Sequence, residues 1–171
     1  MSLQDKIVSR EQAARMLADW RAQGERIVFT NGCFDLLHAG HALYLEQARA
    51  LADRLVVGLN SDESVTAIKG EARPVVPEAE RAQVLAALAS VDLVVIFRER
   101  TSQALLELLR PEVFVKGGDY TPETMNQEEK NFVESYGGEA AVIPAIHETS
   151  SSEIIQRILR LVERIVAVHG E

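Results

Sequence analysis

The fold can be predicted outward from one segment, Thr30-Asn31-Gly32-Cys33-Phe34-Asp35-Leu36-Leu37-His38-Ala39-Gly40-His41. A short apolar run at residues 27–29 precedes it, and residues 42–52 follow with leucines at helical spacing. The stretch therefore predicts a strand, a glycine-containing turn and the start of a helix. In an α/β protein such a junction lies at the carboxyl end of a strand, where ligands bind.

The same stretch contains groups that suit a phosphate ligand. The first amides of a helix have no intrahelical partner and carry partial positive charge. His38 and His41 are spaced to share one helix face, and Gly40 between them leaves the backbone open to a bulky anion. These features predict a polyphosphate site. The alternatives are that the histidines are surface residues or a metal pair, although no third ligand lies nearby in the sequence.

The rest of the chain alternates between the two kinds of element. Continuous apolar runs at residues 55–59, 93–97, 113–115 and 140–143 suit parallel strands covered on both faces. Helices are expected at residues 9–23, 78–89, 102–110, 127–136 and 153–168, with Thr121-Pro122 starting the fourth of these, while residues 64–76 read as irregular. This alternation predicts an α/β fold with a parallel, doubly wound sheet and right-handed crossovers.

Length and composition indicate one globular domain over residues 1–171, with the helix in residues 1–24 packed on it. Hydrophobic residues make up 47% and charged residues 26%, which is ordinary for such a domain. The first residues do not resemble a signal peptide, and no apolar stretch is long enough to span a bilayer. The single cysteine, Cys33, excludes an internal disulfide and favours a reducing cytoplasm.

The net charge of −8 disfavours nucleic acid as the main partner, because neutralising a phosphate backbone needs a basic face. A phosphate ligand requires only that positive groups converge locally. The candidates follow predicted strands or lie in the loops after them, and they are His38, His41, Lys69, Arg73 and Lys116. The alternative is that each long side chain is an ordinary solvated charge.

Residues 31–41 resemble the HxGH motif of the nucleotidyltransferase superfamily, which includes the cytidylyltransferases and pantetheine-phosphate adenylyltransferase. Further matches are Asn60-Ser61-Asp62, Lys69-Gly70, Arg73-Pro74-Val75, Val115-Lys116-Gly117-Gly118-Asp119-Tyr120 and Ser150-Ser151-Ser152-Glu153-Ile154-Ile155. Several motifs in the right order are more specific than any one of them. Together they resemble most the adenylyltransferase domain of the bifunctional ADP-heptose synthases of Gram-negative bacteria, over nearly the whole chain.

The resemblance implies a Rossmann-like sheet of five parallel strands in the order 3-2-1-4-5, with helices on both faces. It implies transfer of AMP from ATP to D-glycero-β-D-manno-heptose 1-phosphate, giving ADP-heptose and pyrophosphate for lipopolysaccharide core synthesis, with Mg²⁺ required. The partners would be these small molecules, with neither nucleic acid nor membrane involved. Small enzymes of this superfamily are often dimers or larger. The chain has no room for the kinase domain of the bifunctional enzymes, which implies a stand-alone adenylyltransferase.

Two other functions remain as alternatives, a cytidylyltransferase acting on glycerol phosphate and a non-catalytic nucleotide-binding module. Glycerol-phosphate cytidylyltransferases typically carry Thr where this chain has Cys33, and an Arg-Thr-Glu-Gly run where it has Ala145-Ile146-His147-Glu148. Both differences favour the heptose branch. The intact set of His38, His41 and Lys69 argues against a module that only binds.

The resemblance also implies roles for individual residues. The expected catalytic residues are His38, His41 and Lys69. The expected nucleotide-binding residues are Asn31, Gly32, Cys33, Phe34, His38, Gly40, His41, Lys116, Gly118, Asp119, Ser150, Ser151 and Ser152. The expected sugar-phosphate residues are Asp35, Lys69 and Arg73, and no residue is expected to be a dedicated metal ligand.

Some of these residues have a simpler explanation. Gly117-Gly118 could be a plain turn, and Ser150 with Glu153 forms a helix-capping box whether or not a nucleotide binds. Cys33 is interpreted as a small packing residue, since nucleotidyl transfer needs no thiol nucleophile.

Overall fold

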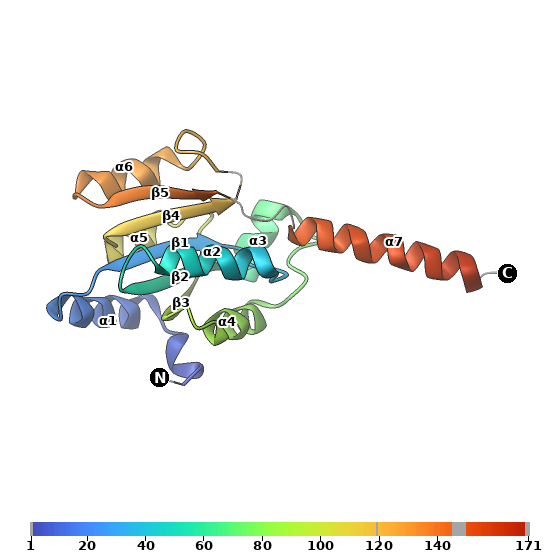
Figure 1. Ribbon diagram of the computed structural model, residues 1–171, viewed down its shortest axis with the longest axis horizontal. Helices are drawn as coiled ribbons and strands as arrows, with labels where there is room; N and C mark the ends of the chain where they lie inside the picture. The colour runs from blue at the N-terminus through green and yellow to red at the C-terminus, as the bar shows by residue number, and fades with distance from the viewer. Residues whose placement is uncertain (1, 119, 145–149, 170–171) are drawn as a thin grey trace.

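The computed structural model describes residues 2–118, 120–144 and 150–169. A parallel sheet occupies the centre with helices on both of its faces, and the last helix extends away from it (Figure 1). The strands are β1 (Ile27–Gly32), β2 (Arg54–Asn60), β3 (Leu93–Phe97), β4 (Val113–Gly118) and β5 (Glu139–Pro144). Their order is β3-β2-β1-β4-β5, which confirms the predicted order 3-2-1-4-5.

Successive residues of each strand point to opposite faces, so the sheet has two cores. Phe29 points into the core under α1 (Arg10–Ala22), α5 (Gln103–Leu109) and α6 (Gln127–Ser135). Its neighbour Val28 points into the core under α2 (Ala39–Arg49) and α4 (Glu78–Ala87). Burial on both faces explains why the strands are continuous apolar runs.

The N-terminal segment packs on the sheet as expected. Ser9 caps α1 through a capping box with Gln12, as the sequence predicts. Ala13 and Leu17 of this helix are fully buried in the core. A short 3₁₀ helix, η1 (Gln4–Lys6), comes before α1 and was not predicted.

The prediction that residues 64–76 are irregular is wrong for their first part. The structure has a helix there, α3 (Asp62–Lys69). Ser61 caps it by accepting a hydrogen bond from the Ser64 amide, and Asp62 and Glu63 add negative charge to the first turn. Gly70 ends it at φ +96°, a conformation that favours glycine. Lys69 is therefore the last residue of a helix and not part of a free loop.

The expectation that Thr121-Pro122 begins a helix is also wrong. Thr121 and Thr124 form a tight turn in which the Thr124 hydroxyl accepts a hydrogen bond from the Thr121 amide. The helix α6 begins later, where the Asn126 side chain accepts hydrogen bonds from the amides of Glu128 and Glu129. Asparagine is a strong N-cap residue, and this local signal decides where α6 starts.

The final helix, α7 (Ser151–His169), begins two residues earlier than predicted. No helix of the described residues is both long enough and apolar enough to cross a membrane.

Candidate active site

Two neighbouring strands bring the first residues of the site together. β1 and β4 pair in parallel with Thr30 opposite Val115, so both strands end at the same edge of the sheet. β1 ends in Asn31-Gly32, and β4 ends in Lys116-Gly117-Gly118. The Lys116 ammonium donates a hydrogen bond to Asn31 Oδ1. Lys116 is 9% exposed, and this burial lowers the pKa of its ammonium group.

The two histidines of residues 30–41 lie against each other. His38 is the N-cap residue of α2 and His41 lies in its first turn, with 3.9 Å between the ring centroids. Burial, with a smaller contribution from the neighbouring His38, lowers the pKa of His41 to about 4. His41 is therefore neutral near pH 7. Its Nδ1 atom is buried and has no hydrogen-bond partner among the described residues.

Phe34 lies in the turn between β1 and α2 and has an unusual backbone conformation. Its φ is +45°, a left-handed conformation that is strained for a bulky side chain. Its ring is nearly buried and meets the His41 ring edge-on, with 5.3 Å between centroids. The strained backbone conformation of Phe34 therefore lies in the turn that leads to His38 and His41.

Tyr44 supports the floor of the site, although no motif in the sequence marks it as a site residue. Its hydroxyl lies 2.6 Å from the Thr30 hydroxyl and donates to the Val115 carbonyl, which ties α2 to both central strands. Burial raises the pKa of this phenol. A Cβ atom at Gly117 would collide with the Tyr44 ring. Gly117 is thus needed for close packing of β4 on α2. The interpretation of Gly117 as part of a plain turn does not explain this requirement.

Asp35 is 4% exposed and positions the segment that follows α3. One carboxylate oxygen accepts a hydrogen bond from Arg73 Nε at 2.6 Å, and the other accepts from the amides of Val75 and Val76. The sequence predicts that Asp35 contacts the sugar. The structure shows it lining the pocket with both oxygens already holding Arg73 and its loop.

Arg81 is a second residue that sequence reasoning missed. It is 1% exposed, and its guanidinium donates to the carbonyls of Cys33, Asn60 and Val76 and to the Asp62 carboxylate. It therefore joins the ends of β1 and β2 to the segment after α3. The available signal was a charged residue beside Ala82 on the apolar face of its helix, where charged groups are rare unless paired.

These elements surround a pocket of about 950 Å³ at the carboxyl ends of the strands. The described site residues expected from the sequence that line it are Asn31, Gly32, Cys33, Phe34, Asp35, His38, Gly40, His41, Lys69, Arg73, Lys116, Gly118, Ser150, Ser151 and Ser152. Asp119 and residues 145–149 lie outside the described residues. Other lining residues that the sequence analysis did not assign are Tyr44, Asn60, Ile68, Arg100, Thr101, Tyr120 and Pro144.

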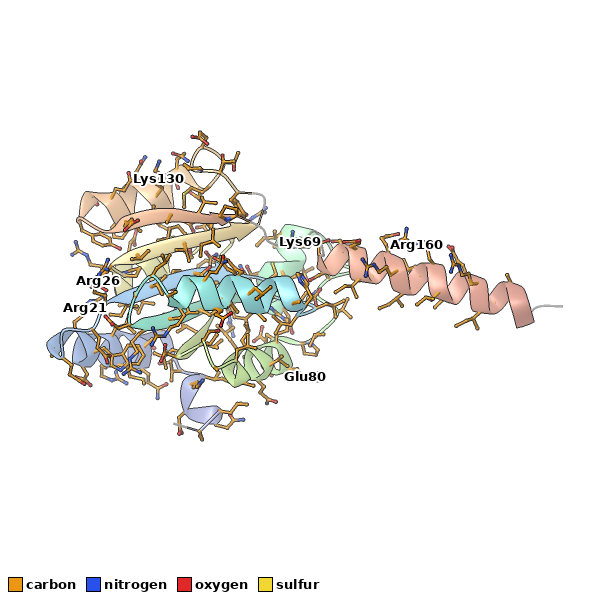
Figure 2. The ribbon with its side chains drawn as sticks, in the orientation of Figure 1. Arg21, Arg26, Lys69, Glu80, Lys130 and Arg160 are labelled. Atoms are coloured by element: carbon orange, nitrogen blue, oxygen red, sulfur yellow. The ribbon has the colours of Figure 1, made fainter. Side chains whose placement is uncertain are left out.

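The pocket's rim comes from α3 and α7. Lys69 is exposed at the end of α3 and lies beside the start of α7 (Figure 2). Ser150 Oγ accepts a hydrogen bond from the Glu153 amide, which is the predicted capping contact. Ser151 Oγ donates to the Leu36 carbonyl at 2.9 Å and ties the base of α7 to the histidine turn.

The charged groups of the pocket suit an anion. Lys69, Arg73, Arg100 and Lys116 line it together with the two imidazoles. Asp35 is the acidic residue in the described lining, and its carboxylate is paired with Arg73. Within the described ranges, no three His, Cys, Asp or Glu side chains are grouped so as to hold a metal ion. Burial raises the pKa of the Cys33 thiol, which keeps it protonated and unreactive near neutral pH.

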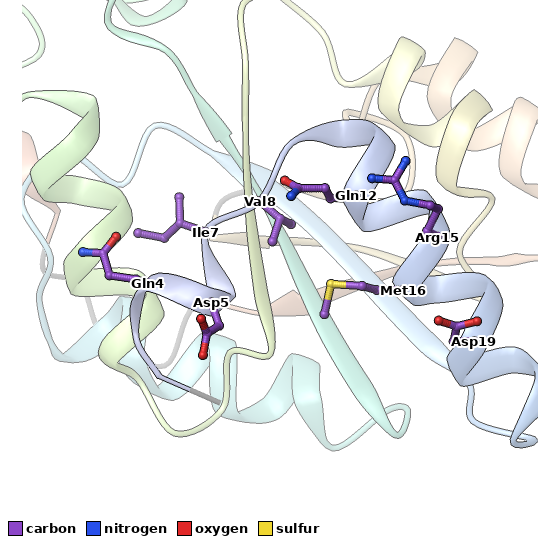
Figure 3. A pocket seen from close by; sticks show the side chains of 8 residues that line it. All are labelled: Gln4, Asp5, Ile7, Val8, Gln12, Arg15, Met16 and Asp19. Carbon is purple, nitrogen blue, oxygen red and sulfur yellow. The ribbon is translucent and has the colours of Figure 1, made fainter.

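A second hollow, of about 560 Å³, lies between η1 and α1 (Figure 3). Ile7 at its edge forms a parallel bridge with Val94, near the start of β3, so this hollow faces away from the strand ends that carry the histidines. Its polar lining consists of Gln4, Asp5, Gln12, Arg15 and Asp19. This mixed surface lacks the converging cations of the larger pocket.

Comparison with known proteins places the whole arrangement in a family. A family model described as cytidylyltransferase-like matches residues 29–157. The proteins named "Bifunctional protein HldE" from Syntrophotalea carbinolica and Koribacter versatilis are 52% and 51% identical over 154 residues, which is 90% of this chain. The chain spans 31% of the length of these relatives.

Solved structures agree at the level of the fold. A lipopolysaccharide core biosynthesis protein from Thermoplasma volcanium matches with a TM-score of 0.60 and 24% identity, covering 74% of this chain and all of that one. Pantothenate synthetase from Thermus thermophilus matches with a TM-score of 0.58 and 17% identity, covering 87% of this chain and 67% of that one. With a family model over most of its length, the chain belongs to the cytidylyltransferase-like family of nucleotidyltransferase enzymes.

Proposed function

We propose that this protein transfers AMP from ATP to D-glycero-β-D-manno-heptose 1-phosphate. A phosphate oxygen of the sugar attacks the α-phosphorus of ATP, the bond from that phosphorus to the bridging oxygen of the β-phosphate breaks, and pyrophosphate leaves. The product is ADP-heptose, which would serve lipopolysaccharide core synthesis. The observation that carries the proposal is the convergence of two imidazoles, two lysines and a helix start on one pocket.

The histidine turn would hold the triphosphate. His38 and His41 line the pocket at the start of α2, and the first amides of a helix favour an anion because they lack intrahelical partners. A sugar phosphate is already largely ionised near neutral pH, so the reaction needs no strong base. The protein's task is to align two anions and stabilise the charge that moves to the leaving group. A neutral His41 can donate one hydrogen bond, and the charge of the triphosphate would favour its protonation.

The two lysines would act from opposite sides of the pocket. Lys116 is buried at the end of a central strand and aligned by Asn31, so it would hold a phosphate at a fixed place. Lys69 is exposed at the end of α3, so its long side chain would reach over the substrates from the pocket edge. Arg73, held by Asp35, would bind the sugar phosphate on the same side.

Mg²⁺ would accompany ATP and would supply positive charge that lowers the repulsion between the triphosphate and the attacking phosphate. The described pocket lining is better suited to Mg²⁺ that arrives with ATP than to Mg²⁺ held by protein side chains. Its acidic side chain is engaged by Arg73, and the other charged groups are cations. The ion would therefore be held mainly by the substrates.

The choice of ATP and heptose phosphate rests on the sequence. The relatives that match most of this chain at about half identity are named HldE, and the motifs resemble the adenylyltransferase domain of ADP-heptose synthases. The chain spans 31% of those relatives, so the proposal concerns the adenylyl transfer alone. We also infer that it acts as one domain on small molecules, in the cytoplasm, where ATP is available.

The test is a steady-state measurement of pyrophosphate release with heptose 1-phosphate held saturating and either ATP or CTP varied in the presence of Mg²⁺. A site that hydrogen-bonds a base edge rejects the wrong base strongly, because buried polar groups are then left unpaired. We expect ATP to be preferred over CTP by at least roughly a hundredfold in kcat/KM.

Glycerol 3-phosphate in place of the heptose substrate is the matched control, and we expect little turnover with it. A preference for CTP together with turnover of glycerol phosphate would establish the cytidylyltransferase alternative. Binding of ATP without pyrophosphate release from any sugar phosphate would instead indicate a nucleotide-binding module.

A further inference from the structure

The helix α7 carries a wide apolar face that points into solvent. Its outer turns present large aliphatic side chains that are each about half exposed or more, namely Ile158, Leu159, Leu161, Val162, Ile165 and Val166. These positions recur at steps of three and four, so they occupy one side of the helix. The opposite, polar side carries Glu153, Gln156, Arg157, Arg160, Glu163 and Arg164, with the small Ala167 among them.

The helix also stands apart from the rest of the molecule. It leaves the edge of the sheet beside α3 and extends away from both helical layers (Figure 1). Its base is attached through the hydrogen bond from Ser151 to Leu36, and Arg160 projects into solvent from an outer turn (Figure 2). A helix that is apolar on one side derives its stability mainly from packing that side against a partner.

We propose that α7 packs antiparallel against α7 of a second copy of this chain, about a twofold axis. The area is sufficient for this. Covering the exposed parts of these six aliphatic side chains in each of two copies removes on the order of 1,000 Å² from water, the size at which specific interfaces begin. An isologous pair uses the same surface twice, so one apolar face is enough to form it.

The chemistry of the helix favours a protein partner over a membrane surface. Helices that lie on membranes have a basic polar side and carry aromatic residues at the interface. The polar side of α7 mixes Arg157, Arg160 and Arg164 with Glu153 and Glu163, and its apolar side is purely aliphatic. The chain as a whole has a net charge of −8, which repels anionic lipid.

The shape of the molecule favours the antiparallel direction. Packed helices have axes about 8–10 Å apart. The sheet and its helices extend to both sides of the α7 axis at the base of the helix (Figure 1), so parallel helices at that spacing would force the two bodies into one another. Antiparallel helices leave the bodies at opposite ends of the pair.

An antiparallel pair would bring the outer half of the partner's helix toward the base of α7, where exposed apolar residues also occur. Val75 is 54% exposed, and its amide is bound by Asp35, next to the Leu36 carbonyl that holds Ser151. Ile68 is 39% exposed at the pocket rim. The outer half of the partner's helix would end beside these residues, and thus beside the segment that carries Lys69 and Arg73.

The first test is the mass of the full chain in solution over a concentration series, by sedimentation equilibrium or light scattering. We expect the unchanged protein to be a dimer and Val162→Glu, which puts a charge on the apolar side, to be a monomer. Ala167→Glu adds the same charge to the polar side of the same helix, and we expect it to remain a dimer. Circular dichroism checks that both variants keep their helix content.

Two results of this test would overturn the proposal. One is an unchanged protein that is monomeric throughout the series. The other is a Val162→Glu variant that associates as strongly as Ala167→Glu, because the interface would then lie elsewhere.

The direction of the pair is tested by oxidative cross-linking in a Cys33→Ser background. Antiparallel helices bring like positions together only near the middle of the helix, so Ile158→Cys or Val162→Cys should cross-link and Ile155→Cys, nearer the base, should not. Cross-linking of Ile155→Cys as readily as the others would show parallel helices. Binding of the chain to phosphatidylglycerol vesicles that is lost in Val162→Glu would instead assign the face to a membrane.

Discussion

The proposed chemistry depends most on the imidazole side chains of His38 and His41. They face the pocket with their ring centroids 3.9 Å apart. We expect His38→Ala and His41→Ala each to lower turnover about a hundredfold or more, the usual effect of removing one transition-state hydrogen-bond donor. The measurement is pyrophosphate release from ATP and heptose 1-phosphate.

Circular dichroism of the same variants is the control, and both should remain folded because their side chains face a ligand pocket. Near-normal turnover in either variant would show that the histidines do not contact the reacting phosphates.

The lowered pKa of His41 predicts how the free energy of unfolding depends on pH. In the unfolded chain the imidazole titrates near its ordinary pKa of 6.5, whereas in the fold it does so at about 4. Between these values the unfolded chain binds a proton that the folded chain does not, so stability falls as pH drops from 6.5 to 4.

His41→Gln removes this effect, so it should lose less stability than the unchanged protein between pH 7 and pH 5. The difference should be on the order of 1 kcal/mol, allowing for the partial exposure of the ring. Urea unfolding at the two pH values measures it, and equal losses in both proteins would argue against a buried neutral His41.

At the scale of elements, Arg81 of α4 holds several segments in place. Its guanidinium binds the carbonyls of Cys33, Asn60 and Val76. We expect Arg81→Met to lower the free energy of unfolding by about 3 kcal/mol or more, because it leaves buried carbonyls without donors. Denaturant unfolding measures this loss.

The matched control for Arg81 is Arg157→Met on α7, where the arginine pairs with Glu153 but is 60% exposed. That change should stay within about 0.5 kcal/mol, as is typical of exposed ion pairs. Similar losses in the two variants would mean that Arg81 does not organise the site.

At the scale of the whole molecule, the pocket joins elements that are distant in the sequence. Its walls come from the ends of β1 and β4, the starts of α2 and α7, and the end of α3. ATP should therefore stabilise the entire fold. At a concentration of 100 times Kd it adds about 2.7 kcal/mol to the free energy of unfolding.

That stabilisation corresponds to a rise of roughly 5–10 °C in Tm for a chain of this size. Thermal unfolding with and without ATP and Mg²⁺ measures the rise. The His38→Ala variant is the comparison, and we expect a much smaller rise with it. An equal rise in both proteins would place the nucleotide away from the histidine turn.

Local signals in the sequence predicted most of the elements correctly. The apolar runs located every strand, and Ser9 with Gln12 correctly predicted the start of α1. The predictions failed at residues 62–69 and at Thr121-Pro122, where the deciding signals were single capping residues, Ser61 and Asn126. The motif that contains His38 and His41 can be recognised in the sequence because its residues lie close together along the chain.

Local sequence patterns are therefore enough to predict the succession of strands and helices along the chain and the local groups that can bind a phosphate. These depend on periodicity, turn residues and helix starts, all of which act over a few neighbouring residues. The strand order was available from the sequence only through family resemblance, and the structure confirms it.

Which side chains act together depends on how the strands and helices pack. The bond from Lys116 to Asn31 depends on the pairing of β1 with β4, and the buried contacts of Arg81 depend on α4 packing over the ends of two strands. The low pKa of His41 arises from burial, which no local pattern expresses. Such effects depend on distance and desolvation in three dimensions, and residues far apart in the sequence produce them only after the chain has folded.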